Sequence, residues 1–299
     1  MNSDTAAHPY DSANIVLRVV KAFGWTELLC LGYCTIPTMP MMLLGRGGFH
    51  QRQLVNRSIR LLRLTPGDRV LDTACGTGYT SDLMARQGCL VTGVDLLEHH
   101  VRRASERYAS HPGVRFFNAD ATHLKADESA AHFGDATFDK VHCLQGAFQF
   151  GPDGRRRFLE EAYRVLKPGG RLVIVDFFWH TERPDEIAVL DPERLVRNTW
   201  QFEEFEPLHR YRRLARETGF TPRAAIDWTR PVLHRTLHGL ALLARLARSS
   251  VGREVLVRLR PSLASVEPAQ WERFVSIADA HAAVRGRMGY AAVILDKPA

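Results

Sequence analysis

A short glycine loop constrains the fold of this chain more than any other feature of its sequence. An apolar run at residues 69–72 ends at Asp72, and the loop that follows contains Gly76 and Gly78 before a helical pattern that runs through Ala85. Glycine lets a backbone turn tightly and approach a ligand without a Cβ in the way. A strand, a glycine loop and a helix in this order predict the first unit of a parallel α/β sheet that binds a ligand at the loop.

Strand-like and helix-like segments alternate from residue 69 to 177, which predicts that the parallel sheet continues beyond this first unit. The regularity ends at residues 178–218, which are polar, aromatic and rich in arginine, and residues 232–285 are mostly helical in pattern. We expect strands at 69–72, 90–94, 114–117, 138–144, 171–177, 220–228 and 287–295, helices through 83–85, 98–108 and 158–162, and a sharp turn at 167–170 before the fifth strand.

Three aspartates stand where predicted strands end. Asp72 precedes the glycine loop, Asp95 ends the second strand and Asp120 follows the third. The carboxyl ends of adjacent parallel strands form the ligand crevice of open α/β sheets, so these acids are expected to converge on one cleft. The alternative is that each acid only caps a helix.

Four segments together resemble class I S-adenosylmethionine-dependent methyltransferases over about residues 60–177. They are the DxxxGxG loop at 72–78, Asp95, the segment Asn118-Ala119-Asp120-Ala121, and the run RVLKPGGRL at 164–172. The competing interpretation, a dinucleotide-binding domain, expects glycine or alanine at a third loop position where this chain has Ser81. The resemblance implies an α/β fold: a Rossmann-like, seven-stranded sheet, mostly parallel with one reversed edge strand. A helical N-terminal cover and a helical insertion before the last strand complete the expected fold.

The same resemblance implies a binding site for S-adenosyl-L-methionine. In that family the glycine loop packs on the methionine portion, the acid after the second strand holds both ribose hydroxyls, and the acid after the third strand meets the adenine amine. By position these are Gly76 and Gly78, Asp95, and Asp120, while Asp72 would orient the cofactor ammonium directly or through water. The complete expected cofactor site is Tyr33, Asp72, Ala74, Gly76, Gly78, Asp95, Leu96, Asp120, Ala121 and Leu144, with no metal site.

The segment Leu31-Gly32-Tyr33 is similar to an element of the small-molecule branch, which includes sterol, tocopherol, isoprenoid and macrolide enzymes. The Asn-Pro-Pro-Tyr motif of the branches that modify DNA and protein is absent after the fourth strand. The expected activity is therefore O- or C-methylation of a small, apolar natural product such as a polyketide, a terpenoid or an aromatic compound. The alternative is a protein of this fold that binds the cofactor but catalyses a cyclisation or rearrangement without methyl transfer.

The predicted acid–base chemistry of the site is unusual for this branch. Sterol- and tocopherol-type relatives carry glutamate and histidine where this chain has Gln145 and Gln149, and an amide can orient a ligand but cannot accept a proton at neutral pH. His180, just beyond the fifth strand, is the remaining candidate base because imidazole titrates near neutrality. If no residue acts as a base, positioning of an already nucleophilic acceptor next to the sulfonium would be enough for the transfer. The predicted catalytic residues are His180, Gln149 and Gln145, whereas His142 is expected to pack between layers of the fold.

The composition is that of an ordinary globular protein, with 45% apolar and 24% charged residues. Forty basic against 33 acidic residues give a net charge of +7, which we interpret as a solvated surface without a nucleic-acid partner. Five cysteines without a CxxC pair and a start without a secretory leader predict a reduced, cytoplasmic protein. The uncharged stretch 28–44 is interrupted by glycine and prolines, so a buried cover or pocket wall is expected there rather than a membrane span.

The expected organisation has four parts. They are an N-terminal helical cover at 1–60, a cofactor-binding core at 61–180, core completion plus a helical substrate cap at 181–285, and a final strand at 286–299. Within the cap, the leucine-rich stretch 237–246 with nearby arginines predicts a basic amphipathic helix. That helix could pack on the core, cover a lipophilic acceptor or contact a membrane surface. A homo-oligomer formed through the helical additions is also left open.

Overall fold

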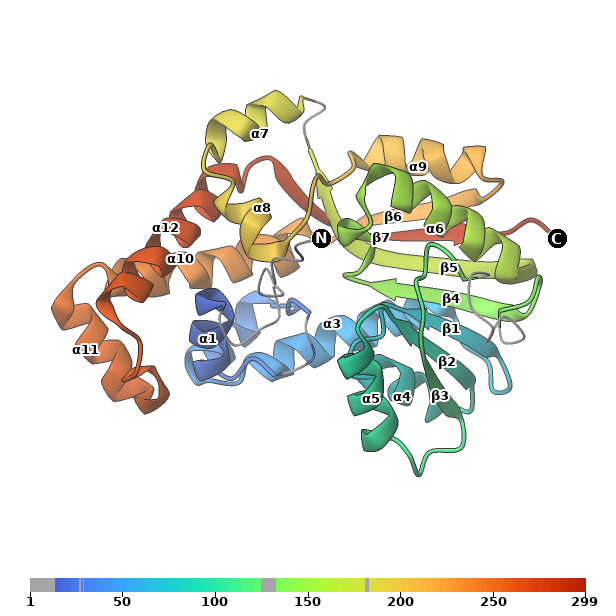
Figure 1. Cartoon of the computed structure of the whole chain (residues 1–299), viewed down its shortest axis with the longest axis horizontal. Helices are drawn as coiled ribbons and strands as arrows, with labels where there is room; N and C mark the ends of the chain where they lie inside the picture. The colour runs from blue at the N-terminus through green and yellow to red at the C-terminus, as the bar shows by residue number, and fades with distance from the viewer. Residues whose placement is uncertain (1–13, 27, 29, 125–132, 181–182) are drawn as a thin grey trace, which may run out of the picture. The chain divides into compact units, whose positions relative to one another are not determined.

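Seven strands form a single sheet in the order β3-β2-β1-β4-β5-β7-β6 (Figure 1). The computed structural model describes residues 14–26, 28, 30–124, 133–180 and 183–299, so residues 1–13 of the expected N-terminal cover and 181–182 of the expected cap lie outside the described residues. The strands are β1 (Arg69–Thr73), β2 (Leu90–Asp95), β3 (Val114–Asn118), β4 (Phe138–Leu144), β5 (Leu166–Trp179), β6 (Thr221–Asp227) and β7 (Met288–Asp296).

The predicted mostly parallel sheet is confirmed. β1 pairs in parallel with β2 and β4, β2 with β3, and β4 with β5, while β6 and β7 pair antiparallel. β7 also runs opposite to β5, because Arg171 near the start of β5 is 2.8 Å from Asp296 at the end of β7. The reversed strand is not at the edge as expected, since β7 lies between β5 and β6.

The segment Lys167-Pro168-Gly169-Gly170 differs from the expected turn before the fifth strand. β5 already begins at Leu166, which pairs with Phe138, and the pairing resumes at Arg171 opposite Lys140. The segment is therefore an irregularity within the strand, where Gly169 has φ +75°. A residue with positive φ is far less strained as glycine, which accounts for Gly169. A Cβ on Gly170 would lie 2.8 Å from Lys167 O, so close backbone approach accounts for the second glycine.

The chain divides into two compact units. The sheet unit comprises residues 54–179, 204–228 and 289–299, and the helical unit comprises residues 1–53, 180–203 and 229–288. Helices of the sheet unit are α4 (Tyr79–Ala85), α5 (Glu98–Arg107), η3 (Ala147–Gln149), α6 (Gly151–Val165) and α9 (Leu208–Glu217), and α3 (Gly47–Leu62) begins in one unit and ends in the other.

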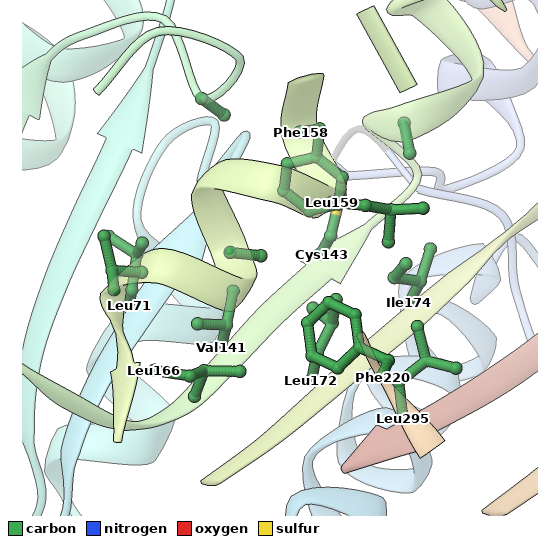
Figure 2. Close-up of a cluster of buried hydrophobic side chains, with 14 of the residues drawn as sticks. Leu71, Val141, Cys143, Phe158, Leu159, Leu166, Leu172, Ile174, Phe220 and Leu295 are labelled. Atoms are coloured by element: carbon green, nitrogen blue, oxygen red, sulfur yellow. The ribbon is translucent and has the colours of Figure 1, made fainter. Parts of the chain in front are cut away.

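The core of the sheet unit lies between the strands and the helices α6 and α9 (Figure 2). From α6 it takes Phe158, Leu159 and Ala162, which fall on one helix face at the i, i+1, i+4 spacing of an amphipathic helix. From the strands it takes side chains such as Leu71 and Ile174, all buried. Strands covered by helices read as nearly continuous apolar runs, which is why the sequence pattern predicted the strands, although β5 begins at Leu166 and not at residue 171.

The helical unit holds the N-terminal segment and the predicted insertion. Its elements are α1 (Ile15–Ala22), η1 (Ile36–Thr38), α2 (Pro40–Leu43), α7 (Pro184–Leu190), α8 (Leu195–Trp200), η4 (Thr229–His234), α10 (Arg235–Ala247), α11 (Ser250–Leu259), η5 (Pro261–Leu263) and α12 (Pro268–Val284). The uncharged stretch 28–44 is not uniformly buried, contrary to expectation. Cys30 and Cys34 are buried, but Ile36 and Leu44 are 66% and 68% exposed.

The leucine-rich stretch forms α10 as predicted. Leu237 and Leu240 are buried within the helical unit, whereas Leu242 and Leu246 are exposed, so one face of the helix packs and the other does not. No helix in the described part of the chain is long and apolar enough to cross a membrane. Among the same residues, no three histidine, cysteine, aspartate or glutamate side chains gather in a way that could hold a metal ion.

Candidate functional site

The sheet brings the predicted acids to one edge of the sheet unit. Asp72 on β1 is in register with Gly93 of β2 and His142 of β4, Asp95 ends β2 next to Asn118 of β3, and Asp120 follows two residues later. Because β1, β2 and β3 are parallel, their carboxyl ends share this edge, where open α/β sheets bind ligands.

The loop after β1 has a backbone that most side chains would not allow. Gly76 has φ +54° and Gly78 has φ +81°, and a Cβ on Gly78 would lie 2.6 Å from the ring of Phe116. Ala74 also has a positive φ of +52°, which is uncommon for a residue other than glycine. Backbone strain of the kind seen at Ala74 concentrates at functional sites. The amides of Gly76 and Gly78 donate to Asp95 Oδ2 and Cys75 O, which fixes the turn.

Asp95 is the acid most closely joined to this loop. Its Oδ2 accepts a hydrogen bond from Gly76 N at 2.8 Å, its Oδ1 accepts one from Leu97 N at 3.0 Å, and His100 Nδ1 lies 3.3 Å from Oδ1. Burial alone would raise the pKa of Asp95, but His100 and the two backbone N–H groups outweigh it and the pKa is lowered. The side chain is therefore a fixed carboxylate.

The hydrogen bonds of Asp95 also limit what it can accept. A carboxylate offers about four lone-pair sites, and Gly76 N, Leu97 N and the ring nitrogen of His100 are already directed toward that of Asp95. A ligand diol that donated two hydrogen bonds would therefore share a lone pair or displace His100, whose contact is the longest of the three. His100 was not singled out from the sequence, because a histidine two residues into a helix carries no motif.

Asp72 has a different environment from the one expected. It is 2% exposed, its Oδ2 accepts a hydrogen bond from Ser81 Oγ at 2.6 Å, and His142 Nδ1 lies 2.9 Å from its Oδ1. His142 Nε2 lies 3.1 Å from Ser58 Oγ, so a buried polar chain joins α3, β4, β1 and α4 beneath the loop. His142 thus packs between layers as predicted, but it does so as part of this polar chain. The carboxylate of Asp72 is not open to a ligand, so its effect on one would pass through Ser81 and the loop.

Asp120 and its neighbours differ in exposure. Asp120 is half-buried and accepts hydrogen bonds from the amide and the hydroxyl of Thr122, each at 2.8 Å. Burial raises its pKa, but these two bonds and His123 outweigh burial and lower the pKa overall. Leu96 is 69% exposed beside Asp95, whereas the side chain of Ala121 is buried in the core. An exposed leucine next to a fixed carboxylate offers a ligand one apolar surface and one polar anchor.

The end of β4 carries the predicted glutamines. Gln145 has φ +53°, its backbone N donates to Val175 O at 2.9 Å, and its Nε2 donates to the Tyr290 hydroxyl at 2.8 Å. Gln149 lies on η3 and is half-buried, and Leu144 is half-buried at the end of the strand. A Cβ on Gly146 would lie 2.4 Å from the Cβ of Ala74, so the connections after β1 and β4 meet at this edge.

Asp176 near the end of β5 is an acid that the sequence reasoning did not assign. It is 7% exposed and accepts hydrogen bonds from Phe148 N at 2.9 Å and Phe177 N at 2.8 Å. Burial raises its pKa to about 7, against the opposing effect of those two amides and of the Arg155 charge. Its signal in the sequence is a carboxylate within an otherwise apolar run of strand residues.

Tyr33 and His180 belong to the helical unit. Tyr33 N donates to His50 O at 2.9 Å, and Gly32 allows this approach because a Cβ there would lie 2.5 Å from His50 Cβ. His180 is exposed directly after β5, and its backbone N donates to Arg287 O at 2.8 Å. Their contributions to the site of the sheet unit stay predictions.

Several known proteins have sequences similar to this chain. Residues 70–170 match a family described as a methyltransferase domain. The 27-O-demethylrifamycin SV methyltransferase of Amycolatopsis mediterranei is 34% identical over 186 residues, which cover 60% of this chain and 64% of that protein. An S-adenosyl-L-methionine-dependent Diels-Alderase of Talaromyces variabilis is 34% identical over 171 residues, 56% of this chain and 54% of that protein.

The chain thus spans less than two thirds of the length of these curated relatives. Among solved structures, the cyclopropane synthase MmaA2 of Mycobacterium tuberculosis has a TM-score of 0.68 at 16% identity, and the match covers 98% of this chain and 96% of that one. At such low identity the likeness concerns the fold, and it extends over both units.

Proposed function

We propose that this chain, whose residues 70–170 match a methyltransferase-domain family, transfers a methyl group from S-adenosylmethionine to a small, apolar natural product. One observation carries the proposal: the matched residues contain the strained glycine loop and the fixed carboxylate of Asp95, joined by a 2.8 Å hydrogen bond. A ribose diol is a natural partner for a carboxylate held in this way, because charge-assisted hydrogen bonds are the strong ones.

The residues present fit the cofactor. Gly76 and Gly78 both have positive φ and a Cβ on Gly78 would meet the Phe116 ring, so this turn needs glycine, and its backbone is proposed to contact the methionine portion of the cofactor. Asp95 would hold the ribose and Asp120 the adenine amine, with Leu96 exposed beside them. The remaining proposed contacts are Ala74, Ala121 and Leu144, Tyr33 from the helical unit, and Asp72 acting through Ser81.

When bound, S-adenosylmethionine supplies an electrophilic methyl group on a sulfonium. The chain's own residues at the end of β4 orient the acceptor: Gln145 is fixed by Tyr290, and neither it nor Gln149 can take up a proton. We propose that alignment of the acceptor provides most of the acceleration. His180 is the proposed base if a proton must leave before transfer.

The decisive experiment incubates the protein with cofactor carrying an isotopically labelled methyl group and a panel of apolar hydroxyl and unsaturated acceptors of natural-product type. Label that enters a product, with one S-adenosylhomocysteine released per product, is the expected result. A chain that binds the cofactor in calorimetry but yields neither labelled product nor S-adenosylhomocysteine would contradict methyl transfer.

A second candidate function is cyclisation or rearrangement without methyl transfer. The specific observation in its favour is the 34% identity to a Diels-Alderase described as dependent on S-adenosylmethionine. The absence of a proton acceptor among Gln145 and Gln149 fits this function as well. The same incubation separates the two functions, because a cyclisation gives a product of unchanged mass without release of S-adenosylhomocysteine.

Several narrower statements belong to the proposal. The acceptor is a polyketide, a terpenoid or an aromatic compound, methylated at oxygen or carbon, and no nucleic acid takes part. A location in the cytoplasm, a contact of the basic helix α10 with a membrane surface, and a homo-oligomer remain predictions from the sequence. Size-exclusion chromatography with light scattering measures the last of these.

A further inference from the structure

Two ionisable side chains that do not contact the glycine loop are buried near the carboxyl ends of β4 and β5 in the sheet unit. Arg155 on α6 is 1% exposed and Asp176 near the end of β5 is 7% exposed. Burying a charge is costly unless hydrogen bonds compensate for it, and an apolar pair of similar size is often at least as stable. The burial of these two side chains therefore indicates a role beyond stability, and that role depends on the backbone segments that they hold.

Asp176 holds the connection that follows β4. Its Oδ2 accepts a hydrogen bond from the backbone of Phe148 on η3, and its Oδ1 accepts one from its own neighbour Phe177. The two carboxylate oxygens thus tie η3 to the end of β5. This contact fixes the backbone at the base of the Phe148 side chain.

Arg155 holds a second segment, residues 204–207, which runs beside the end of β5. Its Nη1 donates to Glu204 O at 2.8 Å, and its Nη2 lies 3.5 Å from Glu206 Oε2. Trp179 and Pro207 form a parallel bridge that places the segment along the strand. Arg155 Nε has no hydrogen-bond partner among the described residues, so one donor of the buried guanidinium is left unsatisfied.

The two held segments carry aromatic rings that meet on Phe177. The Phe148 and Phe177 centroids are 5.3 Å apart, Phe177 and Phe205 stack at 5.3 Å with an interplanar angle of 11°, and Phe148 and Phe205 are 6.1 Å apart. Phe148 and Phe205 are buried, and Phe177 alone of the three is partly exposed. The hydroxyl of Tyr290, whose ring is 5.2 Å from Phe177, accepts the hydrogen bond from Gln145.

We propose that Asp176 and Arg155 are positioning residues that hold the buried rings of Phe148 and Phe205 against Phe177, so that the partly exposed ring of Phe177 is fixed as the contact for a planar, unsaturated acceptor. The inference rests on the proposed function and narrows its substrate class. A ring pair adds about 0.5–1.5 kcal/mol beyond the area that it buries, so a fixed ring distinguishes a planar acceptor from a saturated one. Each buried charge fixes the backbone of one ring-bearing segment.

The test uses the full chain saturated with S-adenosylhomocysteine and two probes of the same skeleton, 1-naphthol and decahydro-1-naphthol. Calorimetry should show that 1-naphthol binds about 2- to 12-fold more tightly than its saturated counterpart. Phe177→Leu should abolish that preference. The matched control is Phe220→Leu, which removes a ring that pairs with Tyr163 next to β6 and should leave the preference unchanged.

Arg155→Met and Asp176→Asn should each weaken 1-naphthol binding on the order of tenfold, the effect of losing one charge-assisted hydrogen bond. Neither should change the affinity for S-adenosylhomocysteine by more than about twofold. Arg155→Lys, which keeps the charge with fewer donors, replaces Arg155→Met if the latter does not fold, and it should show an intermediate loss.

A pH profile separates positioning from mere structural support. The groups that face Asp176 or its partners are Arg155 on α6, Cys143 on β4, Tyr211 on α9, and Glu206 before α9. Burial raises the pKa of Cys143 to about 12 and that of Tyr211 well above its usual value, so neither thiol nor phenol changes charge between pH 6 and 8. A protonated Asp176 cannot accept fully from both amides. Binding of 1-naphthol should therefore be weaker at pH 6 than at pH 8 in the wild type and independent of pH in Asp176→Asn.

The proposal is overturned if the wild type does not bind 1-naphthol or does not prefer it to the saturated probe. It is equally overturned if Arg155 and Asp176 variants that remain folded bind it as tightly as the wild type, or if the pH dependence persists in Asp176→Asn. Failure of the wild type to bind S-adenosylhomocysteine is a separate result, because it contradicts the proposed function itself.

Discussion

Replacing Asp95 by asparagine tests the cofactor site at its most sharply defined point. The substitution keeps the shape of the side chain but removes its charge and turns one of its two oxygens into an NH₂ donor. That donor would face either Gly76 N or Leu97 N, both of which now donate to the carboxylate. The variant therefore loses one acceptor for the loop and the charge that strengthens every hydrogen bond to a ribose.

The magnitude follows from these contacts. A hydrogen bond to a charged group contributes about 1.5–3 kcal/mol, so the loss of one corresponds to a rise in Kd of about 10- to 150-fold. Isothermal titration calorimetry with S-adenosylhomocysteine measures this directly. The matched control is Asp139→Asn at the opposite, amino-terminal end of β4, which makes the same change in net charge. Asp139 accepts hydrogen bonds from Arg69 N and Lys167 Nζ and has no part in the site.

Two outcomes would contradict this role of Asp95. One is an unchanged Kd in a folded Asp95→Asn protein, and the other is an equal loss of affinity in Asp139→Asn, which would indicate a general effect of net charge. The pH dependence has a fixed sign, because the pKa of Asp95 is lowered in the folded chain. Its stabilising contribution is present above the unfolded pKa of about 3.9 and is lost as the pH falls through the lower folded value.

Three further changes have expected outcomes. Gly78→Ala should destabilise the chain by about 1–3 kcal/mol in urea denaturation and weaken cofactor binding, because its φ is +81° and a Cβ meets Phe116; an unchanged midpoint would contradict the strain. Asp176 keeps its proton up to about pH 7 in the folded state, so wild-type stability should fall by about 2–3 kcal/mol from pH 5 to pH 8 relative to Asp176→Asn; parallel profiles would refute the raised pKa. His180→Ala should lower kcat by less than about tenfold if positioning suffices, and by roughly 10²–10⁴ if His180 is the base. We expect the smaller loss, with a wild-type kcat at saturating acceptor that is nearly independent of pH between about 6 and 9, and kcat across that range decides.

The strands and the glycine loop could be predicted because each rests on local physics. An apolar run covered on both faces stays apolar along its length, and Gly76 and Gly78 stand where the backbone needs a positive φ. The position of Asp95 could be predicted for the same reason, since a strand end is a local feature. At Lys167–Gly170 the local sequence predicted a turn, and only the pairing of Phe138 with Leu166 shows that the strand begins before the glycines.

Contacts between residues far apart in the chain could not be predicted. Ser58 and His142 are separated by 84 positions and Gln145 and Tyr290 by 145, yet each pair shares a hydrogen bond or a comparable polar contact. Nothing in the local sequence around His142 indicates a partner on α3. The place of β7 between β5 and β6 belongs to the same class, because it depends on which strand the end of the chain meets.

Asp72 and Asp176 show how such long-range contacts decide what a residue can do. Both are aspartates near the carboxyl end of a buried strand, and local sequence does not separate them. Asp72 meets Ser81 and His142, whereas Asp176 meets two backbone amides and, from α6, the charge of Arg155. Burial then dominates at Asp176, and its pKa rises to about 7. Asp72 supports the loop that would hold the cofactor, and Asp176 would position the ring that contacts the acceptor, so the division of roles follows from their partners and not from their residue type.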